Sequence, residues 1–260
     1  MLQQSGEPAT KIMVMTVGGP NPWMVINALD QQFDVHVLME EPESKAGIFR
    51  RRERRLGTVQ AVGQLATMAA AKMIRWAARH RTEEICSLYG ADPRFNPSVN
   101  VTTVRSINSP ETLEIVQQVN PAAILLVSTR LMKRDILSAL TVPVLNLHAG
   151  INPAYRGQMG GYWALVRGDR ENFGATVHLV DAGTDTGATL YQVRAVPSAS
   201  DCISTYPMLL TAAALEITCR AVEDAANGRL QPIAPSGPSE LHFPPTLWRW
   251  LWNGVRRRIL

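Results

Sequence analysis

Val144-Leu145-Asn146-Leu147-His148 is an apolar stretch in which an amide and an imidazole stand two residues apart. Its length and composition predict a β-strand, and because side chains alternate along a strand, Asn146 and His148 are expected on the same face. A second apolar run, residues 175–180, leads into a loop rich in Asp and Gly that contains Asp185. An amide, an imidazole and a carboxylate near strand ends can polarise a carbonyl group and move protons. These residues therefore predict an enzyme.

Outward from this stretch, the chain alternates short apolar runs with helical patterns, which is typical of an α/β protein with a mostly parallel sheet. Strands are expected at residues 11–17, 33–39, 99–104, 122–128, 142–148, 175–180 and 189–196. Helices are expected at residues 23–29, 110–120, 133–140, 157–168 and 202–227. Ser109 and Pro110 mark the start of the second helix, and Gly228 marks the end of the last. The site then lies at the carboxyl end of a strand, where ligands bind in open α/β sheets.

Residues 45–90 interrupt this alternation and are rich in Ala, Met and Arg. Within them, residues 60–81 predict one long helix or two, ending near Gly90. Apolar side chains recur there near helical spacing, and we interpret this stripe as core packing rather than as a ligand site. The stripe consists of Leu65, Met68, Ala69, Met73, Trp76 and Ala77. The sheet is thus expected to carry a helical insert.

The C-terminal part differs in composition, so residues 1–230 are expected to form the catalytic domain and residues 231–260 an extension. Residues 232–245 are rich in Pro and Ser and predict a linker. The helix expected at residues 246–259 contains Trp248, Trp250, Trp252, Arg256, Arg257 and Arg258. Such a helix either anchors at a membrane interface or packs its tryptophans on the body or on a second subunit. We favour packing, either on the body or on the second subunit of a homodimer.

Composition is that of an ordinary folded protein, since 46% of the 260 residues are apolar and 18% are charged. Cys86, Cys202 and Cys219 lack the spacing of metal ligands, which predicts reduced thiols and no metal site. The N-terminal residues are polar and lack the apolar core of a signal peptide, and no apolar run is long enough for a membrane span. A cytoplasmic protein is therefore expected.

The net charge of +4 is concentrated in two arginine-rich segments, Arg50–Arg55 and Arg256–Arg258. Such clusters can bind phosphate groups, anionic lipid or nucleic acid. We interpret them as a solvated helix face and a solvated chain end.

Several further elements follow one another in a fixed order. They are Asn146-Leu147-His148, Pro153-Ala154-Tyr155-Arg156-Gly157, Gly168-Asp169, Gly174-Ala175-Thr176-Val177-His178 and Asp181-Ala182-Gly183-Thr184-Asp185-Thr186-Gly187. With this order and spacing, the chain resembles the formyltransferases that use 10-formyltetrahydrofolate. That family includes glycinamide ribonucleotide formyltransferase, methionyl-tRNA formyltransferase and sugar-nucleotide N-formyltransferases. The resemblance runs over about residues 95–230 and implies a Rossmann-like, mostly parallel sheet.

The resemblance also implies roles for the polar residues. Asn146 and His148 would stabilise an oxyanion, and Asp185 would assist proton transfer from the attacking amine through water. His178 matches a histidine of the ribonucleotide and sugar enzymes, so it either acts in the site or is a histidine hydrogen-bonded within the sheet. No Ser or Cys lies in a Gly-x-Ser-x-Gly elbow, which favours direct attack through a tetrahedral intermediate without a covalent enzyme intermediate.

The family holds its pterin between the acidic loop and the loop that follows the strand before the Asn-x-His strand. The matching segments here supply Arg130, Leu131, Met132, Val180, Asp181 and Gly183 as expected cofactor-binding residues. Backbone groups would bind the pterin edge while apolar side chains cover it. Arg130 has an alternative interpretation as an exposed charge beside a helix.

The segments in which the chain departs from the family pattern indicate what kind of acceptor to expect. Gly18-Gly19-Pro20-Asn21-Pro22 stands where the ribonucleotide enzyme has a Gly-Ser-Asn phosphate loop, and its prolines lack the N–H donors of a phosphate cradle. The segment after Gly228 is too short for the β-barrel of the tRNA enzyme, so no nucleic acid partner is expected. The expected acceptor is a small-molecule primary amine, either a nucleotide-linked amino sugar or an amino-acid-derived metabolite. Arg50–Arg55 would meet a pyrophosphate if the fold brings it near the strand ends.

Three other functions stay open. The same three polar residues serve formyltetrahydrofolate hydrolase, although no regulatory domain precedes Lys11. The remaining two are glycinamide ribonucleotide formyl transfer and folate binding without catalysis. A Rossmann dehydrogenase is disfavoured because no Gly-x-Gly-x-x-Gly follows the first strand.

Overall fold

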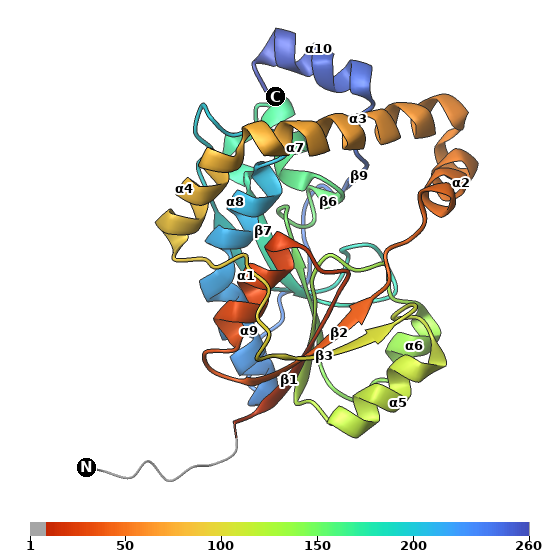
Figure 1. The fold of residues 1–260 in the computed structure, drawn as a ribbon, viewed down its shortest axis with the longest axis vertical. Coiled ribbons are helices and arrows are strands. Elements are labelled where there is room, and N and C mark those ends of the chain that lie inside the picture. The colour runs from red at the N-terminus through yellow and green to blue at the C-terminus, as the bar shows by residue number, and fades with distance from the viewer. Residues whose placement is uncertain (1–8, 260) are drawn as a thin grey trace.

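The computed structural model describes residues 9–259 as a seven-stranded sheet with helices on both faces (Figure 1). The strand order is β3-β2-β1-β4-β5-β7-β8. Strands β3 to β5 of this order run parallel, whereas β7 and β8 are antiparallel to their neighbours. The prediction of an α/β fold with a mostly parallel sheet is confirmed.

The elements of the sheet and its helical layers lie within a few residues of the expected ranges. The strands are β1 (Lys11–Thr16), β2 (Asp34–Glu40), β3 (Asn100–Val104), β4 (Ala123–Leu126), β5 (Val144–His148), β7 (Gly174–Leu179) and β8 (Thr189–Arg194). The helices are α1 (Pro20–Leu29), α5 (Pro110–Val119), α6 (Arg134–Ala139), α7 (Gly160–Val166), α8 (Tyr206–Ala213) and α9 (Leu215–Ala226). A short 3-10 turn, η1 (Arg170–Asn172), precedes β7.

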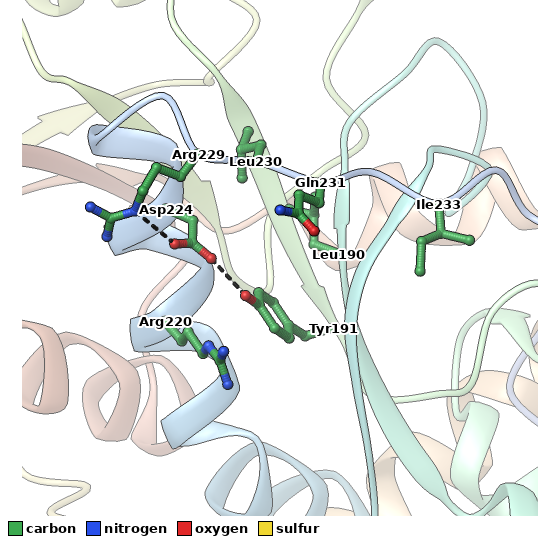
Figure 2. Close-up of a pocket in the computed structure, with 8 residues that line it drawn as sticks. All are labelled: Leu190, Tyr191, Arg220, Asp224, Arg229, Leu230, Gln231 and Ile233. Atoms are coloured by element: carbon green, nitrogen blue, oxygen red, sulfur yellow. Dashed lines mark hydrogen bonds and ion pairs between the residues drawn. The ribbon is translucent and has the colours of Figure 1, made fainter.

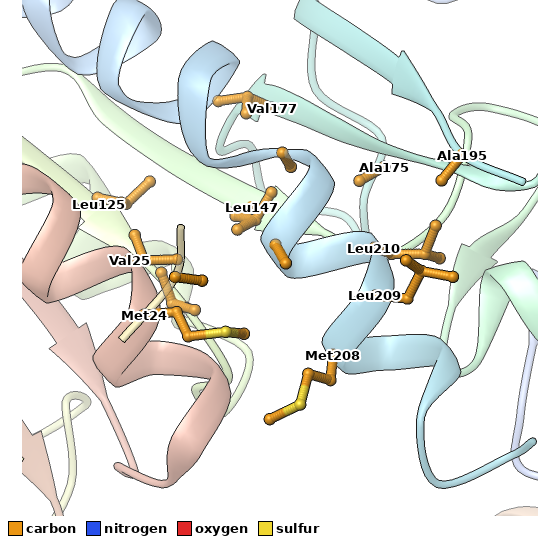
Figure 3. Packing of buried hydrophobic residues seen from close by; sticks show 14 of the residues in the cluster. Met24, Val25, Leu125, Leu147, Ala175, Val177, Ala195, Met208, Leu209 and Leu210 are labelled. Carbon is orange, nitrogen blue, oxygen red and sulfur yellow. The ribbon is translucent and has the colours of Figure 1, made fainter. Parts of the chain in front are cut away.

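Side-chain alternation along β1 explains why helices cover both faces of the sheet. Ile12 and Val14 belong to a large apolar cluster with α1, α8 and α9, whereas Met13 and Met15 belong to a smaller cluster with α5 and α6. Figure 3 shows the larger cluster, in which side chains of the sheet meet those of α1 and α8. Burial on both faces is expected of parallel strands, which are apolar along their whole length.

The insert contains three helices, α2 (Lys45–Leu56), α3 (Thr58–Ala77) and α4 (Arg79–Tyr89). Two of them fall where one or two were expected, and α4 ends at Gly90, whose left-handed backbone closes the helix. The sequence predicted a helical insert and a solvated helix face at Arg50–Arg55 but not the bounds of α2, because this helix buries no side chain and so has no apolar period. It begins at Ser44, whose Oγ accepts the Gly47 N–H at 3.1 Å.

The apolar stripe of α3 does not pack into the core, and that interpretation was wrong. Met68, Met73 and Trp76 are exposed. The buried face of α3 instead consists of the small and polar residues Ala61, Gly63, Gln64 and Thr67. The reason is that α3 lies against the C-terminal segment and not on the sheet.

Residues 202–227 form two helices where one was expected. α8 and α9 are separated by the fully buried Ala214, whose ψ of 1° is not helical. Both helices pack against α1 and β8, but α4 and α7 pack against α8, whereas β4 packs against α9. The bend at Ala214 lets both halves follow their different partners, and no Gly or Pro marks it in the sequence.

The Pro- and Ser-rich residues 232–245 form two pairings that the sequence did not predict. β9 (Leu241–His242) pairs in parallel with β6 (Arg156–Gly157), and Ile233 bridges to Thr189. Pairings this short leave no periodicity in a sequence. The chain then continues into α10 (Leu247–Arg257), which lies along α3 (Figure 1).

None of the helices within residues 9–259 combines the length and the hydropathy that a membrane-spanning segment needs. The expectation of an N-terminus without a signal peptide falls mostly on residues 1–8, which lie outside the described residues.

Candidate active site

The strands β5 and β7 form the floor of the candidate site. Across this antiparallel pair, Asn146 lies opposite His178 and His148 lies opposite Thr176. The chain then turns through residues 180–187 and returns as β8, and the base of this turn is closed by the Leu179 N–H, which donates to Ala188 O at 2.9 Å. The turn folds back over β5, which explains how a residue far along the chain reaches the Asn-x-His strand.

Three side chains converge at the Asp185 carboxylate, and all four residues of this cluster were expected from the sequence. Oδ1 accepts from Asn146 Nδ2 at 3.2 Å and lies 3.3 Å from His178 Nε2. Oδ2 lies 3.5 Å from His148 Nδ1 and accepts the Gly157 N–H at 2.8 Å. The structure thus brings an amide, two imidazoles and a carboxylate into one contiguous polar cluster.

Backbone carbonyl groups determine which ring nitrogens carry protons. His148 Nε2 lies 2.7 Å from Tyr155 O, and His178 Nδ1 lies 2.7 Å from Leu179 O. Because a carbonyl oxygen only accepts hydrogen bonds, each of these nitrogens must donate. The second nitrogen of each ring, His148 Nδ1 or His178 Nε2, faces Asp185 and is the one that can gain or lose a proton.

The environment of Asp185 keeps its carboxyl group ionised. Burial raises the pKa of this group, but His148, His178 and the Gly157 N–H outweigh burial and lower the pKa to about 2. A carboxylate that is largely removed from water interacts strongly with nearby positive charge. The cluster is therefore suited to take up a proton from a reacting amine and to stabilise it on an imidazole.

The turn that carries Asp185 is held by its own polar groups. Asp185 has a φ of 51°, a left-handed conformation that Asp tolerates better than most residues. Asp181 Oδ1 accepts from the Gly183 N–H at 3.0 Å and from Thr186 Oγ1 at 2.6 Å. From outside the turn, Arg156 Nη1 donates to Thr184 O at 2.9 Å. The side chain of Asp181 thus shapes the turn and does not point into open space.

A close approach of two glycines lies beneath the His148 ring. A Cβ atom on Gly150 would lie 2.5 Å from His148 Nε2 and 2.6 Å from Tyr155 O. A Cβ atom on Gly160, at the start of α7, would lie 2.7 Å from the Cα of Gly150. Only glycine fits at these positions while His148 keeps its hydrogen bond to the carbonyl group of Tyr155.

The segments expected to hold a pterin lie side by side. Met132 is buried in the smaller apolar cluster, and Val180 packs against the same cluster. Leu131, between Arg130 and Met132, is exposed. These neighbouring segments offer apolar cover and backbone groups beside the polar cluster.

The side chain of Arg130 is engaged within the protein, and its backbone is held by Glu40, a residue that the sequence did not single out. Glu40, fully buried at the end of β2, accepts the Arg130 backbone N–H at 2.7 Å and the Ile107 N–H at 3.3 Å. The Arg130 guanidinium donates to the carbonyl oxygens of Arg105 and Glu41. The arginine therefore fastens its loop to the neighbouring strands. The sequence signal that could have identified Glu40 is a charged residue at the end of an apolar strand.

Sequence reasoning also assigned no role to Tyr155, Gly157 and Gly150. Tyr155 and Gly157 act through backbone groups, and Gly150 acts through its lack of a side chain. Residue types do not reveal such contacts, although Tyr155 and Gly157 lie in the quoted stretch that carries the family resemblance.

A pocket of about 320 Å³ lies elsewhere, between β8, α9 and the segment that follows α9. Figure 2 shows that Asp224 in its wall binds both the Tyr191 hydroxyl and Arg229. The pocket contains none of the residues expected in the site. Within residues 9–259, no group of three His, Cys, Asp or Glu side chains lies close enough to hold a metal ion.

The family model described as Formyl transferase matches residues 11–214 of the chain. Over 93 residues, the chain is 37% identical to the methionyl-tRNA formyltransferase of Finegoldia magna, an alignment that covers 35% of this chain and 30% of that protein. Over 149 residues, it is 28% identical to the methionyl-tRNA formyltransferase of Thermodesulfovibrio yellowstonii, with 55% of this chain and 47% of that protein covered. The chain spans less than half the length of these two curated relatives.

Solved structures share the fold. Glycinamide ribonucleotide transformylase 1 from Symbiobacterium toebii aligns with a TM-score of 0.57 at 19% identity and covers 88% of this chain and 100% of its own. A sugar N-formyltransferase from Shewanella sp FDAARGOS_354 aligns with a TM-score of 0.54 at 11% identity and covers 90% of this chain and 76% of its own.

Proposed function

Because the chain belongs to the formyl transferase family, we propose that it transfers a formyl group from 10-formyltetrahydrofolate to a primary amine of a small molecule. The chain is a formyltransferase, and the proposal concerns its two substrates and the residues that act on them. The supporting observation is the convergence of Asn146, His148 and His178 on the ionised carboxylate of Asp185.

The proposed reaction needs no covalent enzyme intermediate. The acceptor nitrogen attacks the formyl carbon, a new C–N bond forms, and the carbonyl oxygen becomes an oxyanion. Asn146 Nδ2 and a proton on His148 Nδ1 stabilise that charge. The ammonium proton leaves through water toward Asp185, the bond from the formyl carbon to N10 breaks, and N10 receives a proton. The products are a formamide and tetrahydrofolate.

The folate is proposed to lie against the two loop segments beside the polar cluster. Met132 and Val180 would cover the pterin, and Leu131 would lie at the rim. Backbone groups from Arg130 to Met132 and around Gly183 would bind the polar edge of the ring. Arg130 and Asp181 enter this proposal as residues that shape the two loops, because their side chains are engaged within the protein.

For the acceptor, we favour a nucleotide-linked amino sugar over an amino-acid-derived metabolite. The connection from β2 leads directly into α2, and this places Arg52 at Gln158, where Nη2 lies 3.4 Å from Oε1. Gln158 follows Gly157, which holds Asp185. Burial and the nearby Arg51 lower the pKa of the Arg52 guanidinium, while Glu43 raises it. A half-buried guanidinium beside the site suits a pyrophosphate.

The experiment is a screen of amines with 10-formyltetrahydrofolate, read by mass spectrometry for the gain of one formyl group. The panel contains nucleotide-linked amino sugars, amino-acid-derived amines, glycinamide ribonucleotide and methionyl-tRNA. Formylation of an amino sugar supports the full proposal. Formylation of methionyl-tRNA alone, the substrate in the names of the curated relatives, would overturn the small-molecule acceptor.

Hydrolysis is separated from transfer by leaving out the amine. The transferase proposal predicts slow formate release without acceptor and fast product formation with it. Formate release at the same rate in both cases would instead indicate a formyltetrahydrofolate hydrolase.

A further inference from the structure

The apolar side of α10 faces solvent. Trp248, Leu251, Trp252 and Val255 recur at the spacing i, i+3, i+4 and i+7, the pattern with which a helix usually covers a core. Here these four side chains are 50% to 85% exposed, whereas the opposite side of the helix supplies the buried Trp250. Within residues 9–259, this apolar side of the helix is thus covered only in part, where Trp248 meets α3.

The neighbouring helix α3 has a similar exposed side. Val59, Val62, Met73 and Trp76 are 52% to 77% exposed. At 100° per residue, they fall within an arc of about 100° on the helix surface. More than half of the large exposed apolar side chains of the described residues lie on α3 and α10. Single exposed apolar residues scattered over a surface are normal, but two neighbouring helices that both expose an apolar side form a patch.

Close packing joins the two helices. A Cβ atom on Gly63 would lie 2.4 Å from the Trp248 ring, so the absence of a side chain there lets the tryptophan lie against α3. Thr67 Oγ1 donates to Pro245 O at 2.8 Å just before α10 begins. Figure 1 shows α10 lying along α3 at one end of the molecule, distant from α5 and α6.

All formal charges of these segments are positive. Residues 54–82 contain Arg and Lys but no Asp or Glu, and residues 243–259 contain Arg but no Asp or Glu. Three of the arginines, Arg256 to Arg258, lie at the end of α10 beside its exposed apolar residues. The Arg256 guanidinium lies 5.7 Å from the centre of the Trp252 ring. Apolar surface bordered by arginines, with no carboxylate on α3 or α10, suits a partner that is both apolar and anionic.

We propose that α10 and the exposed side of α3 form a docking surface for an anionic lipid bilayer. Tryptophan, leucine and valine would enter the boundary between headgroups and acyl chains, and the arginines would contact anionic headgroups. A second copy of the chain that docked with the same two helices is a poorer partner, because the arginines of one α10 would face those of the other and neither helix carries a carboxylate. This proposal does not rest on the identity of the acceptor.

The test is vesicle sedimentation of the full chain. One set of vesicles contains equal amounts of phosphatidylglycerol and phosphatidylcholine, and the other contains phosphatidylcholine alone. We expect binding to the anionic vesicles, a blue shift of tryptophan fluorescence, and weaker binding at high salt. Equal binding to both kinds of vesicle, or none, would overturn the proposal.

Variants test which side chains carry the binding. Leu251→Ser combined with Trp252→Ser removes apolar area that only the membrane would bury, so affinity should fall by about tenfold or more. Val196→Ser combined with Ile233→Ser changes two exposed apolar residues elsewhere and should leave binding intact. Circular dichroism and thermal unfolding check that both variants fold.

A separate measurement addresses the second copy. Sedimentation velocity without lipid should show a species whose mass is the same in the wild type and the Leu251→Ser/Trp252→Ser variant. A dimer that the double substitution dissociates would show that another copy of the chain covers this surface, and would contradict the lipid proposal.

Discussion

His148 Nδ1 lies 3.5 Å from Asp185 Oδ2, while the other nitrogen of the same ring lies 2.7 Å from the carbonyl oxygen of Tyr155. The carbonyl group requires a proton on Nε2, so the remaining proton exchange of this imidazole takes place at Nδ1, directly against the carboxylate. The proposed proton path therefore runs between His148 Nδ1 and the Asp185 carboxylate. The path is also sensitive to any change that rotates the ring.

Gly150→Ala should disable the site without touching a polar residue. Its Cβ atom would lie 2.5 Å from His148 Nε2, and the ring must move to avoid it. A displacement of this kind lowers kcat by about a hundredfold. Gly47→Ala is the matched control, because its Cβ would meet only the side chains of Glu43 and Ser44, just before α2. Equal kcat values for the two variants would refute the close-packing argument.

Replacing the polar residues should lower the rate of the chemical step. Asp185→Asn keeps the shape of the side chain but removes its charge, and kcat should fall by about 10²–10⁴. Asn146→Ala removes a donor to the oxyanion, and kcat should fall by about 10²–10³. Single-turnover kinetics measure the rate of the chemical step in both variants. If a variant retains wild-type kcat, the residue that it replaces has no role in catalysis.

His178 is predicted to position Asn146 and Asp185. Asn146 Nδ2 lies 3.1 Å from His178 Nε2. Loss of this contact in His178→Ala should lower kcat by about tenfold with KM unchanged. His178→Gln places an amide oxygen in reach of Asn146 and should restore most of the activity. Failure of Gln to rescue, together with a much larger loss in the Ala variant, would point to direct proton transfer by His178.

The stability of the protein should depend on the charge of Asp185 at low pH. Its pKa is lowered from 3.8 to about 2 in the fold, so its contribution is complete above pH 3.8 and is lost as the pH falls toward 2. The corresponding free energy of unfolding is about 2 kcal/mol. Denaturant unfolding of the wild type and of Asp185→Asn should therefore converge as the pH falls. A difference that stays constant across this range would contradict the low pKa.

Arg52→Ala should weaken binding of a nucleotide-linked acceptor. One lost charge-assisted contact to a pyrophosphate raises KM by about tenfold, and kcat should change little. Arg50→Ala removes an exposed arginine of the same helix and serves as the control. A KM that is unchanged in the Arg52 variant would favour an acceptor without phosphate.

The sheet could be predicted because its strands are apolar runs bounded by turns, and the polar cluster could be predicted because its residues stand in a fixed order. The exposed side of α3 could not, since helical periodicity identifies an apolar face but not what the face contacts. Ala214 breaks a helix without Gly or Pro, because packing partners on either side differ. Gly157 and Tyr155 hold Asp185 and His148 through backbone groups, which residue identity does not encode.

The most direct test of the central claim is one reaction with 10-formyltetrahydrofolate and a nucleotide-linked amino sugar, analysed by mass spectrometry for the formylated product and for tetrahydrofolate. With the wild type, we predict both products in equal amounts, and with Asp185→Asn both should form at least about a hundredfold more slowly. Formate in place of the formylated sugar, or product formation by Asp185→Asn at the wild-type rate, would contradict the account.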